Sequence, residues 1–191
     1  EESLAFAVLG WADEGDGPTL RLDHERFAYA GKFVMSNTGK AVARGEGGIV
    51  AAVAFSADRT EPTALWLRYV TVARDRRGEG IGPRLCAFVV DRASARGYDR
   101  ARIAVNNPFA FEALYRAGFA FTGRETGIAE LVLERPLDGP PAREDRAAAY
   151  ADGLDRFRDR DLSAAERSFL RERAAAGPRP PPPIDPPGGD G

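Results

Sequence analysis

The sequence predicts an α/β fold in which a mixed sheet carries helices on both of its faces. Two observations indicate this class. From about residue 4 to residue 134, short apolar runs of strand length alternate with stretches in which apolar residues recur at helical spacing. Within this alternation, a strand-like run breaks into a glycine-rich turn at 78–82 and then continues as a helical pattern. With 191 residues, the chain is long enough to bury a substantial core.

The expected elements follow one another with short connections. We expect strands at 4–9, 40–44, 49–56, 64–73, 100–105, 119–124 and 128–134, and helices at 23–34, at 83–96 and from residue 108 onward. Asp23 is a suitable N-cap for the first helix, Gly97 ends the second, and Pro108 suits the start of the third. The four residues 45–48 include three glycines and predict a hairpin turn between the second and third strands.

The glycine-rich turn has the properties of an anion-binding loop. Gly78, Gly80 and Gly82 let the backbone approach a ligand without interference from side chains. The start of a helix leaves several backbone N–H groups without partners, and these groups attract negative charge. A pyrophosphate would fit this arrangement.

Two phosphate-binding families are excluded by single positions. A Walker A loop needs Lys and then Ser or Thr where this chain has Pro83 and Arg84, and the dinucleotide fingerprint needs its third glycine at the position of Pro83. The remaining pattern over residues 77–82 is Arg-x-x-Gly-x-Gly. It resembles the acetyl-CoA loop of the GCN5-related N-acetyltransferase (GNAT) superfamily.

A second segment strengthens this resemblance. The late helix of the superfamily carries Asn, Ala three residues later, Gly eleven residues later and Phe next, and Asn107, Ala110, Gly118 and Phe119 match all four positions. The two segments occur in the expected order and at the expected separation. The resemblance covers about residues 3–135.

The resemblance implies a centrally splayed sheet and acetyl-CoA as co-substrate. In the family the central strand and the next parallel strand separate, and the acyl-pantetheine inserts between them and bonds to exposed backbone. By position, the implied cofactor-binding residues are Val70, Thr71, Val72, Arg77, Gly78, Glu79, Gly80, Ile81, Gly82 and Asn107.

The implied reaction is direct transfer of an acetyl group from acetyl-CoA to a primary amine, either a small molecule or a protein N-terminus. The family usually places a tyrosine seven residues after the asparagine to protonate the departing thiolate, but this position is Leu114. Tyr115 is the catalytic candidate, although one residue turns a helical side chain by about 100°. A local bulge or a different helix start would restore its direction; otherwise Tyr115 is a packing residue.

No acidic residue lies on the strand at 100–105, where relatives that acetylate protein N-termini often carry a general base. Glu130, Glu46, Tyr69 and His24 are the substitutes that the sequence offers. The missing acid and the leucine motivate an alternative function, a catalytically weak or inactive acyl-CoA-binding module with a protein partner.

Composition limits the other partners. The net charge is −2 and the two signs are interspersed, so neither nucleic acid nor a membrane surface is expected as a partner. Cys86 and His24 are the only residues of their types, so we expect no metal site and no intrachain disulfide. No apolar run approaches about 18 residues and no signal segment is recognisable, from which we expect a cytoplasmic protein.

The chain divides into three predicted regions, a GNAT acetyltransferase domain at 1–136, a helical extension at 137–176 and a mobile Pro/Gly-rich tail at 177–191. Two polar helices are expected in the extension, at 143–160 and 163–176, the second opening on a capping box. Their few apolar residues allow three arrangements: packing on the catalytic domain, packing on a second subunit in a homodimer, or covering the acceptor cleft.

Overall fold

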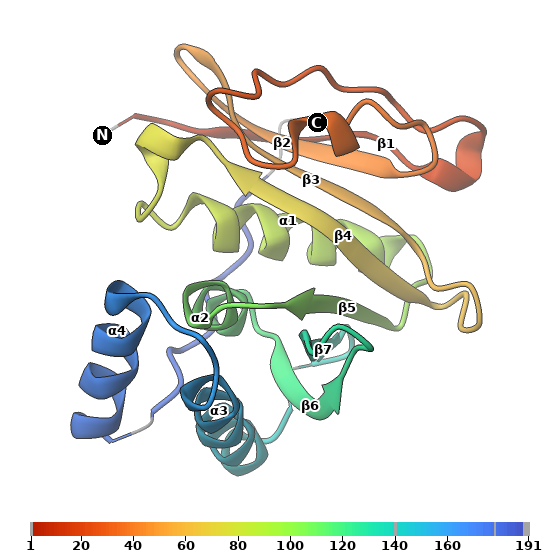
Figure 1. Cartoon of the computed structure of the whole chain (residues 1–191). Helices are drawn as coiled ribbons and strands as arrows, with labels where there is room; N and C mark the ends of the chain where they lie inside the picture. Colours follow the sequence, from red (N-terminus) through yellow and green to blue (C-terminus); the bar gives the residue numbers. More distant parts are fainter. Residues whose placement is uncertain (1, 140, 178, 189–191) are drawn as a thin grey trace.

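The computed structural model describes residues 2–139, 141–177 and 179–188 (Figure 1). Within these residues a seven-stranded sheet has the order β1-β2-β3-β4-β5-β7-β6. Its strands are β1 (Ala5–Gly10), β2 (Gly39–Gly45), β3 (Gly48–Ala57), β4 (Ala64–Val72), β5 (Arg100–Val105), β6 (Ala120–Glu125) and β7 (Leu131–Pro136). The β4–β5 pair is parallel and the other neighbouring pairs are antiparallel, so the predicted mixed sheet is confirmed.

Helices cover both faces of this sheet. The described residues form α1 (Ile81–Ala95), α2 (Pro108–Arg116), α3 (Arg143–Arg158) and α4 (Ala164–Ala175), and three 3₁₀ helices, η1 (Ala12–Glu14), η2 (Ala30–Lys32) and η3 (Arg74–Arg76). Figure 1 shows α1 behind β3 and β4. No helix among the described residues has both the length and the apolar character needed to cross a bilayer.

The two faces of β2 and β3 belong to different apolar clusters, because alternate side chains of a strand point to opposite sides. Ala43 and Val53 face α1 and belong to the main core, whereas Val42 and Ala52 face the other way. This second face is covered by the segment 11–38, from which Phe33 is fully buried.

The sheet opens between β4 and β5. Their parallel pairing covers only the three pairs from Ala64–Arg100 to Trp66–Arg102. Beyond that point β4 stays paired with β3 as far as Val72, and β5 stays paired with β7 as far as Val105. The strands therefore separate toward their C-terminal ends, which confirms the centrally splayed sheet.

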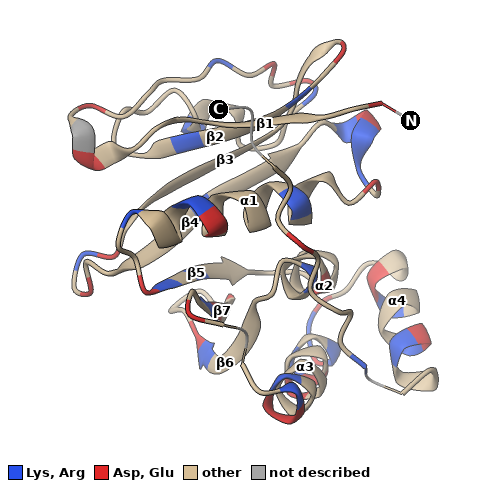
Figure 2. Ribbon diagram, turned by 180° about the vertical axis from the view of Figure 1, so that it is seen from behind, with Lys and Arg blue, Asp and Glu red and all other residues tan. Residues whose placement is uncertain are grey.

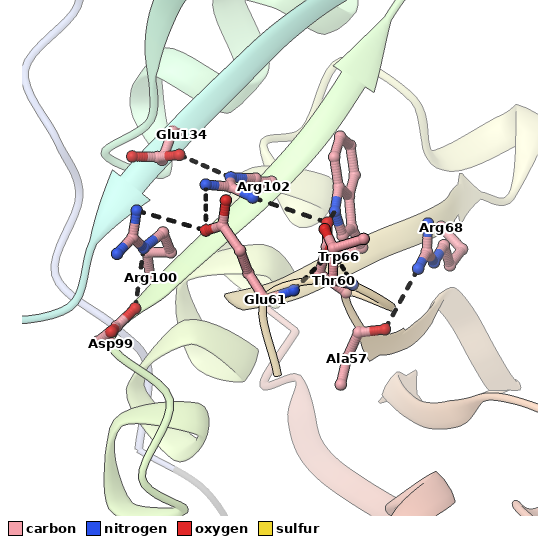
Figure 3. A network of polar contacts seen from close by, with 10 residues as sticks. Ala57, Thr60, Glu61, Trp66, Arg68, Asp99, Arg100, Arg102 and Glu134 are labelled. Atoms are coloured by element: carbon pink, nitrogen blue, oxygen red, sulfur yellow. Dashed lines mark hydrogen bonds and ion pairs between the residues drawn. The ribbon is translucent and has the colours of Figure 1, made fainter. Parts of the chain in front are cut away.

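An ionic network holds the closed end of this opening (Figure 3). Arg102 is 5% exposed, and its Nε and Nη2 lie 2.7 Å from Glu134 and 2.9 Å from Glu61. Burial alone lowers the pKa of Arg102, but the hydrogen bonds to these carboxylates raise it above its ordinary value. Asp58 lies 3.6 Å from the same guanidinium and accepts a hydrogen bond from the indole of Trp66. The network thus ties β4, β5, β7 and the β3–β4 turn together.

The prediction of a helix at 23–34 is wrong. Asp23 begins a turn, since its carbonyl accepts a hydrogen bond from the N–H of Arg26 at 3.0 Å. The carbonyl of Arg26, however, accepts from the N–H of Arg74 at 2.9 Å instead of continuing a helix. Tyr29 then adopts a φ of 61°, a left-handed conformation that a helix cannot contain. Only the 3₁₀ helix η2 remains of the predicted element.

The helices of the C-terminal extension pack on the rest of the chain. Helix α3 lies against β6, and α4 lies against α2 and α3. Tyr150, Leu154 and Phe157 of α3 are buried, which joins this helix to the main core. Of the three arrangements that the sequence left open, the structure shows packing on the preceding residues; the boundaries at 136 and 176 stay predictions.

The tail has no helix or strand over residues 179–188, and two hydrogen bonds connect it to earlier elements. The N–H of Ile184 donates to the carbonyl of Arg116 at 2.8 Å, and Arg146 donates to the carbonyl of Pro181 at 3.1 Å. Its mobility stays a prediction.

Replacing Gly153 by Ala is expected to lower the free energy of unfolding by about 1–3 kcal/mol, as overpacking of a filled core does. A Cβ at this position would overlap Cζ of Phe111, whose ring is fully buried between other aromatic rings. Urea denaturation measures the effect. Ala raises helix stability by about 1 kcal/mol over Gly at an exposed site. A gain in stability would therefore contradict the close α2–α3 contact.

Candidate active site

A cavity of about 950 Å³ occupies the region where β4 and β5 separate. It brings together nearly all the predicted cofactor-binding residues. The members that line it are Val70, Thr71, Val72, Arg77, Gly78, Gly80, Ile81, Gly82 and Asn107. Glu79 is the exception: it does not line the cavity, and its carboxylate lies 2.9 Å from Nε of Arg76.

The glycine loop has the backbone geometry of an anion cradle. Gly78 and Gly80 have φ values of 84° and 76°, and a Cβ at either position would meet no atom within 4 Å. The space beside both residues is therefore open, and the positive φ values favour glycine. Gly80 is also the N-cap of α1, so the N–H groups of Ile81 and Gly82 lie in the first turn, where no intrahelical acceptor exists.

Asn107 fixes the start of the helix on the other side of the cavity. Its Oδ1 accepts a hydrogen bond from the N–H of Ala110 at 2.9 Å, which makes it the N-cap of α2. Its Nδ2 donates to Oδ1 of Asn106 at 3.2 Å. The cap sets the rotation of α2 so that Ala110 and Leu114 line the cavity.

The structure does not bring Tyr115, the candidate catalytic acid, into the cavity. The side chain is fully buried on the opposite side of α2, where its hydroxyl accepts a hydrogen bond from the N–H of Phe121 at 2.9 Å. Its ring packs on Phe111 and Tyr150. Burial raises the pKa of Tyr115 to about 12. The regular helix retains the one-residue shift, and this geometry favours the packing alternative.

The substitute bases fall into two groups. Glu130 and Tyr69 line the cavity, whereas Glu46 and His24 do not. The ring of Tyr69 packs on that of Tyr29 with centroids 5.7 Å apart, and Nζ of Lys32 lies 5.7 Å from the Tyr69 ring. The segment 11–38 therefore shapes this end of the cavity.

Several cavity residues were not predicted from the sequence. Phe169 and Arg173 of α4 line the cavity, and Arg173 donates hydrogen bonds to both carboxylate oxygens of Glu112 at 2.9–3.1 Å. The sequence left covering of the cleft open as one arrangement of these helices, but the polar helix pattern did not specify which residues would reach the cavity. Cys86 also lies at the cavity wall with a buried thiol, and burial raises its pKa to about 12. The thiol is therefore neutral at physiological pH.

The acetyltransferase (GNAT) family model matches residues 9–119, which include the glycine loop and the Asn107 helix. The chain belongs to this family. Membership makes it an acyltransferase, and acetyl-CoA fits as the co-substrate. The family predicted from the two sequence motifs is thus confirmed.

Solved structures of acetyltransferases share the fold. A Bacillus subtilis acetyltransferase in complex with CoA is 13% identical with a TM-score of 0.53, and the match covers 70% of this chain and 99% of that one. A nourseothricin acetyltransferase is 20% identical with a TM-score of 0.50, covering 70% and 98% of the two chains. At these identities the likeness concerns the fold alone. Comparison with curated proteins gives no match.

Replacing Tyr115 by Phe is expected to lower the free energy of unfolding by about 1–3 kcal/mol, because the buried N–H of Phe121 loses its acceptor. Turnover at saturating substrate should change less than twofold. Chemical denaturation and a thiol-release assay measure the two quantities.

The matched control is Tyr29→Phe, which removes a hydroxyl from a side chain that is 55% exposed and should leave stability unchanged. A large loss of turnover in Tyr115→Phe with unchanged stability would instead restore Tyr115 as the acid.

Proposed function

We propose that this protein transfers an acetyl group directly from acetyl-CoA to a primary amine in the cavity between β4 and β5. The observation that carries the proposal is the separation of these strands beyond Trp66 and Arg102. It leaves one edge of β4 without a strand partner beside the glycine loop. Bound acetyl-CoA supplies the activated thioester.

The unpaired edge of β4 would bind the pantetheine arm. Residues 70–72 line the cavity and keep their hydrogen bonds to β3, so their backbone is held rigidly on one side only. The N–H and C=O groups on the other side no longer have β5 as a partner. An extended amide-bearing chain can satisfy them as an added strand would. A backbone N–H near Val72 would polarise the thioester carbonyl.

The glycine loop would bind the diphosphate. First-turn N–H groups of α1 and the guanidinium of Arg77 provide donors and positive charge for it. Pro83 has no N–H and removes one donor from this turn. We assign Glu79 no direct contact with the cofactor, because its carboxylate pairs with Arg76. We assign Asn107 the role of capping α2.

Glu130 is the carboxylate we propose as general base for the amine. The cavity is also lined by Glu112 and Glu166, but Glu112 pairs with Arg173 and Glu166 caps α4. Among the described residues Glu130 has no ion-pair partner, so its carboxylate is available for the proton of an incoming ammonium. With Leu114 in the position of the family's tyrosine, we assign protonation of the thiolate to water.

We propose a primary amine as the acceptor. This amine belongs either to a small molecule or to a protein N-terminus. The cytoplasmic location and the three-part division at 136 and 176 remain proposals that rest on the sequence. We also keep the homodimer as a proposal for the assembly of this protein.

The alternative function is an acyl-CoA-binding module with little or no catalysis and a protein partner. The burial of Tyr115 favours it, because the cavity then lacks the family's usual proton donor. Binding of acetyl-CoA without transfer to any member of a broad amine panel would establish this alternative. Transfer to one member at a rate above that of thioester hydrolysis would exclude it.

Replacing Gly80 by Glu is expected to weaken acetyl-CoA binding at least tenfold in calorimetric titration, because the new carboxylate would stand in the open space of the cradle. Gly48→Glu is the matched control. It also lies at positive φ with no neighbour within 4 Å, but at the start of β3 away from the cavity. Equal affinities of the wild type and both variants would contradict the assignment of the loop.

Replacing Glu130 by Gln is expected to reduce kcat/KM for the amine about 100-fold at neutral pH, the usual effect of losing a general base. The affinity for acetyl-CoA should not change. Glu46→Gln, in the hairpin turn, is the control and should behave as the wild type. Unchanged kcat/KM across pH 6–9 in Glu130→Gln would remove the proposed base.

A further inference from the structure

Helix α4 lies at the same end of the cavity as the glycine loop. Because β4 and β5 are parallel, the elements that follow them meet at one edge of the sheet. The glycine loop follows β4, α2 follows β5, and α4 packs on α2. Figure 1 shows the start of α1, α2 and α4 along one side of the molecule, and Figure 2 shows basic and acidic positions on α4 at that side.

Two contacts attach α4 to α2 at this place. The rings of Phe109 and Phe169 have centroids 5.0 Å apart, and both side chains line the cavity. Arg173 pairs with Glu112, whose side chain is 10% exposed. The extension therefore supplies part of the cavity wall. It would not need to reach the cavity if its only role were to pack on the core.

Two arginines of this wall have no role in the diphosphate site proposed above. Arg116, in the last turn of α2, lines the cavity and has no carboxylate within ion-pair distance among the described residues. Arg173 uses Nε and Nη2 for Glu112, and the planar guanidinium then directs Nη1 away from that carboxylate. The negative charge of Glu112 is matched by these bonds. Arg116 therefore adds an uncompensated positive charge to the wall, and Arg173 adds a guanidinium whose Nη1 does not bond to Glu112.

Coenzyme A carries chemistry that suits this wall beyond its diphosphate. Its adenosine bears a third phosphate at the ribose 3′ position, and arginines are suited to phosphate because they offer several donors in one plane. Its adenine is a flat ring that stacks on aromatic side chains. Phe109 is 46% exposed and lines the cavity, so its ring is accessible to such a ligand.

We propose that α4 completes the cofactor site, with Arg116 and Arg173 binding the ribose 3′-phosphate of CoA and the Phe109–Phe169 pair contacting the adenine. The assignment rests on the proposed function, since it presupposes that the cavity binds CoA. It gives the C-terminal extension a role in cofactor recognition in addition to its contribution to the core.

The test compares calorimetric titrations with CoA and with 3′-dephospho-CoA, which lacks only the third phosphate. The wild type is expected to bind CoA about tenfold more tightly than 3′-dephospho-CoA. The double variant Arg116→Gln/Arg173→Gln should bind the two ligands within about twofold of each other. Its affinity for 3′-dephospho-CoA should equal that of the wild type.

Two controls separate recognition from folding. Arg171→Gln removes an exposed arginine from the same helix that does not line the cavity, and it should keep the tenfold preference. Adding Glu112→Gln to the double variant avoids an unpaired carboxylate, and this triple variant should also show no preference.

Equal binding of CoA and 3′-dephospho-CoA by the wild type would overturn the assignment while leaving the proposed function intact. Retention of the preference in the double and triple variants would also overturn it. Failure of the wild type to bind either ligand would instead refute the cofactor site itself, and the role of α4 with it.

Discussion

Arg102 lies where the central cleft begins. Its guanidinium is bound by carboxylates from β7 and from the β3–β4 turn, and it sits on the last residue of β5 that pairs with β4. Glu61 is 46% exposed, so solvent screens its attraction to Arg102, whereas Glu134 and Asp58 are 24% and 16% exposed. These contacts join the strands at the closed end of the cleft. Beyond it the two strands follow their outer partners, β3 and β7, and the space between them becomes the cavity.

The remaining features of the site follow from this geometry. The glycine loop continues from the open end of β4, and α2 continues from the open end of β5. The extension then packs on α2 through the Glu112–Arg173 pair and reaches the same opening. The cavity thus has a backbone edge, an anion cradle and an arginine-bearing wall. These are different kinds of group, each suited to a different part of one elongated ligand.

The sequence predicted the parts of this site that are encoded locally. The strand, glycine turn and helix at 70–82 depend on neighbouring residues, so their pattern was sufficient. The prediction of a helix at 23–34 failed because the apolar spacing there reflects packing on the sheet. The positive φ of Tyr29 also interrupts any helix. Predicting the direction of the Tyr115 side chain required knowledge of how α2 is rotated about its axis. Predicting that Arg173 reaches the cavity required knowledge of how α4 packs on α2, which sequence spacing alone does not specify.

Hydrogen exchange measured by mass spectrometry, with and without saturating acetyl-CoA, tests the central claim most directly, that the open edge of β4 and the glycine loop form the acetyl-CoA site. The account predicts slower exchange in peptides covering 67–72 and 78–85, with no change in a peptide covering β1. Unchanged exchange at 67–72, with protection appearing instead around His24 and Lys32, would contradict it.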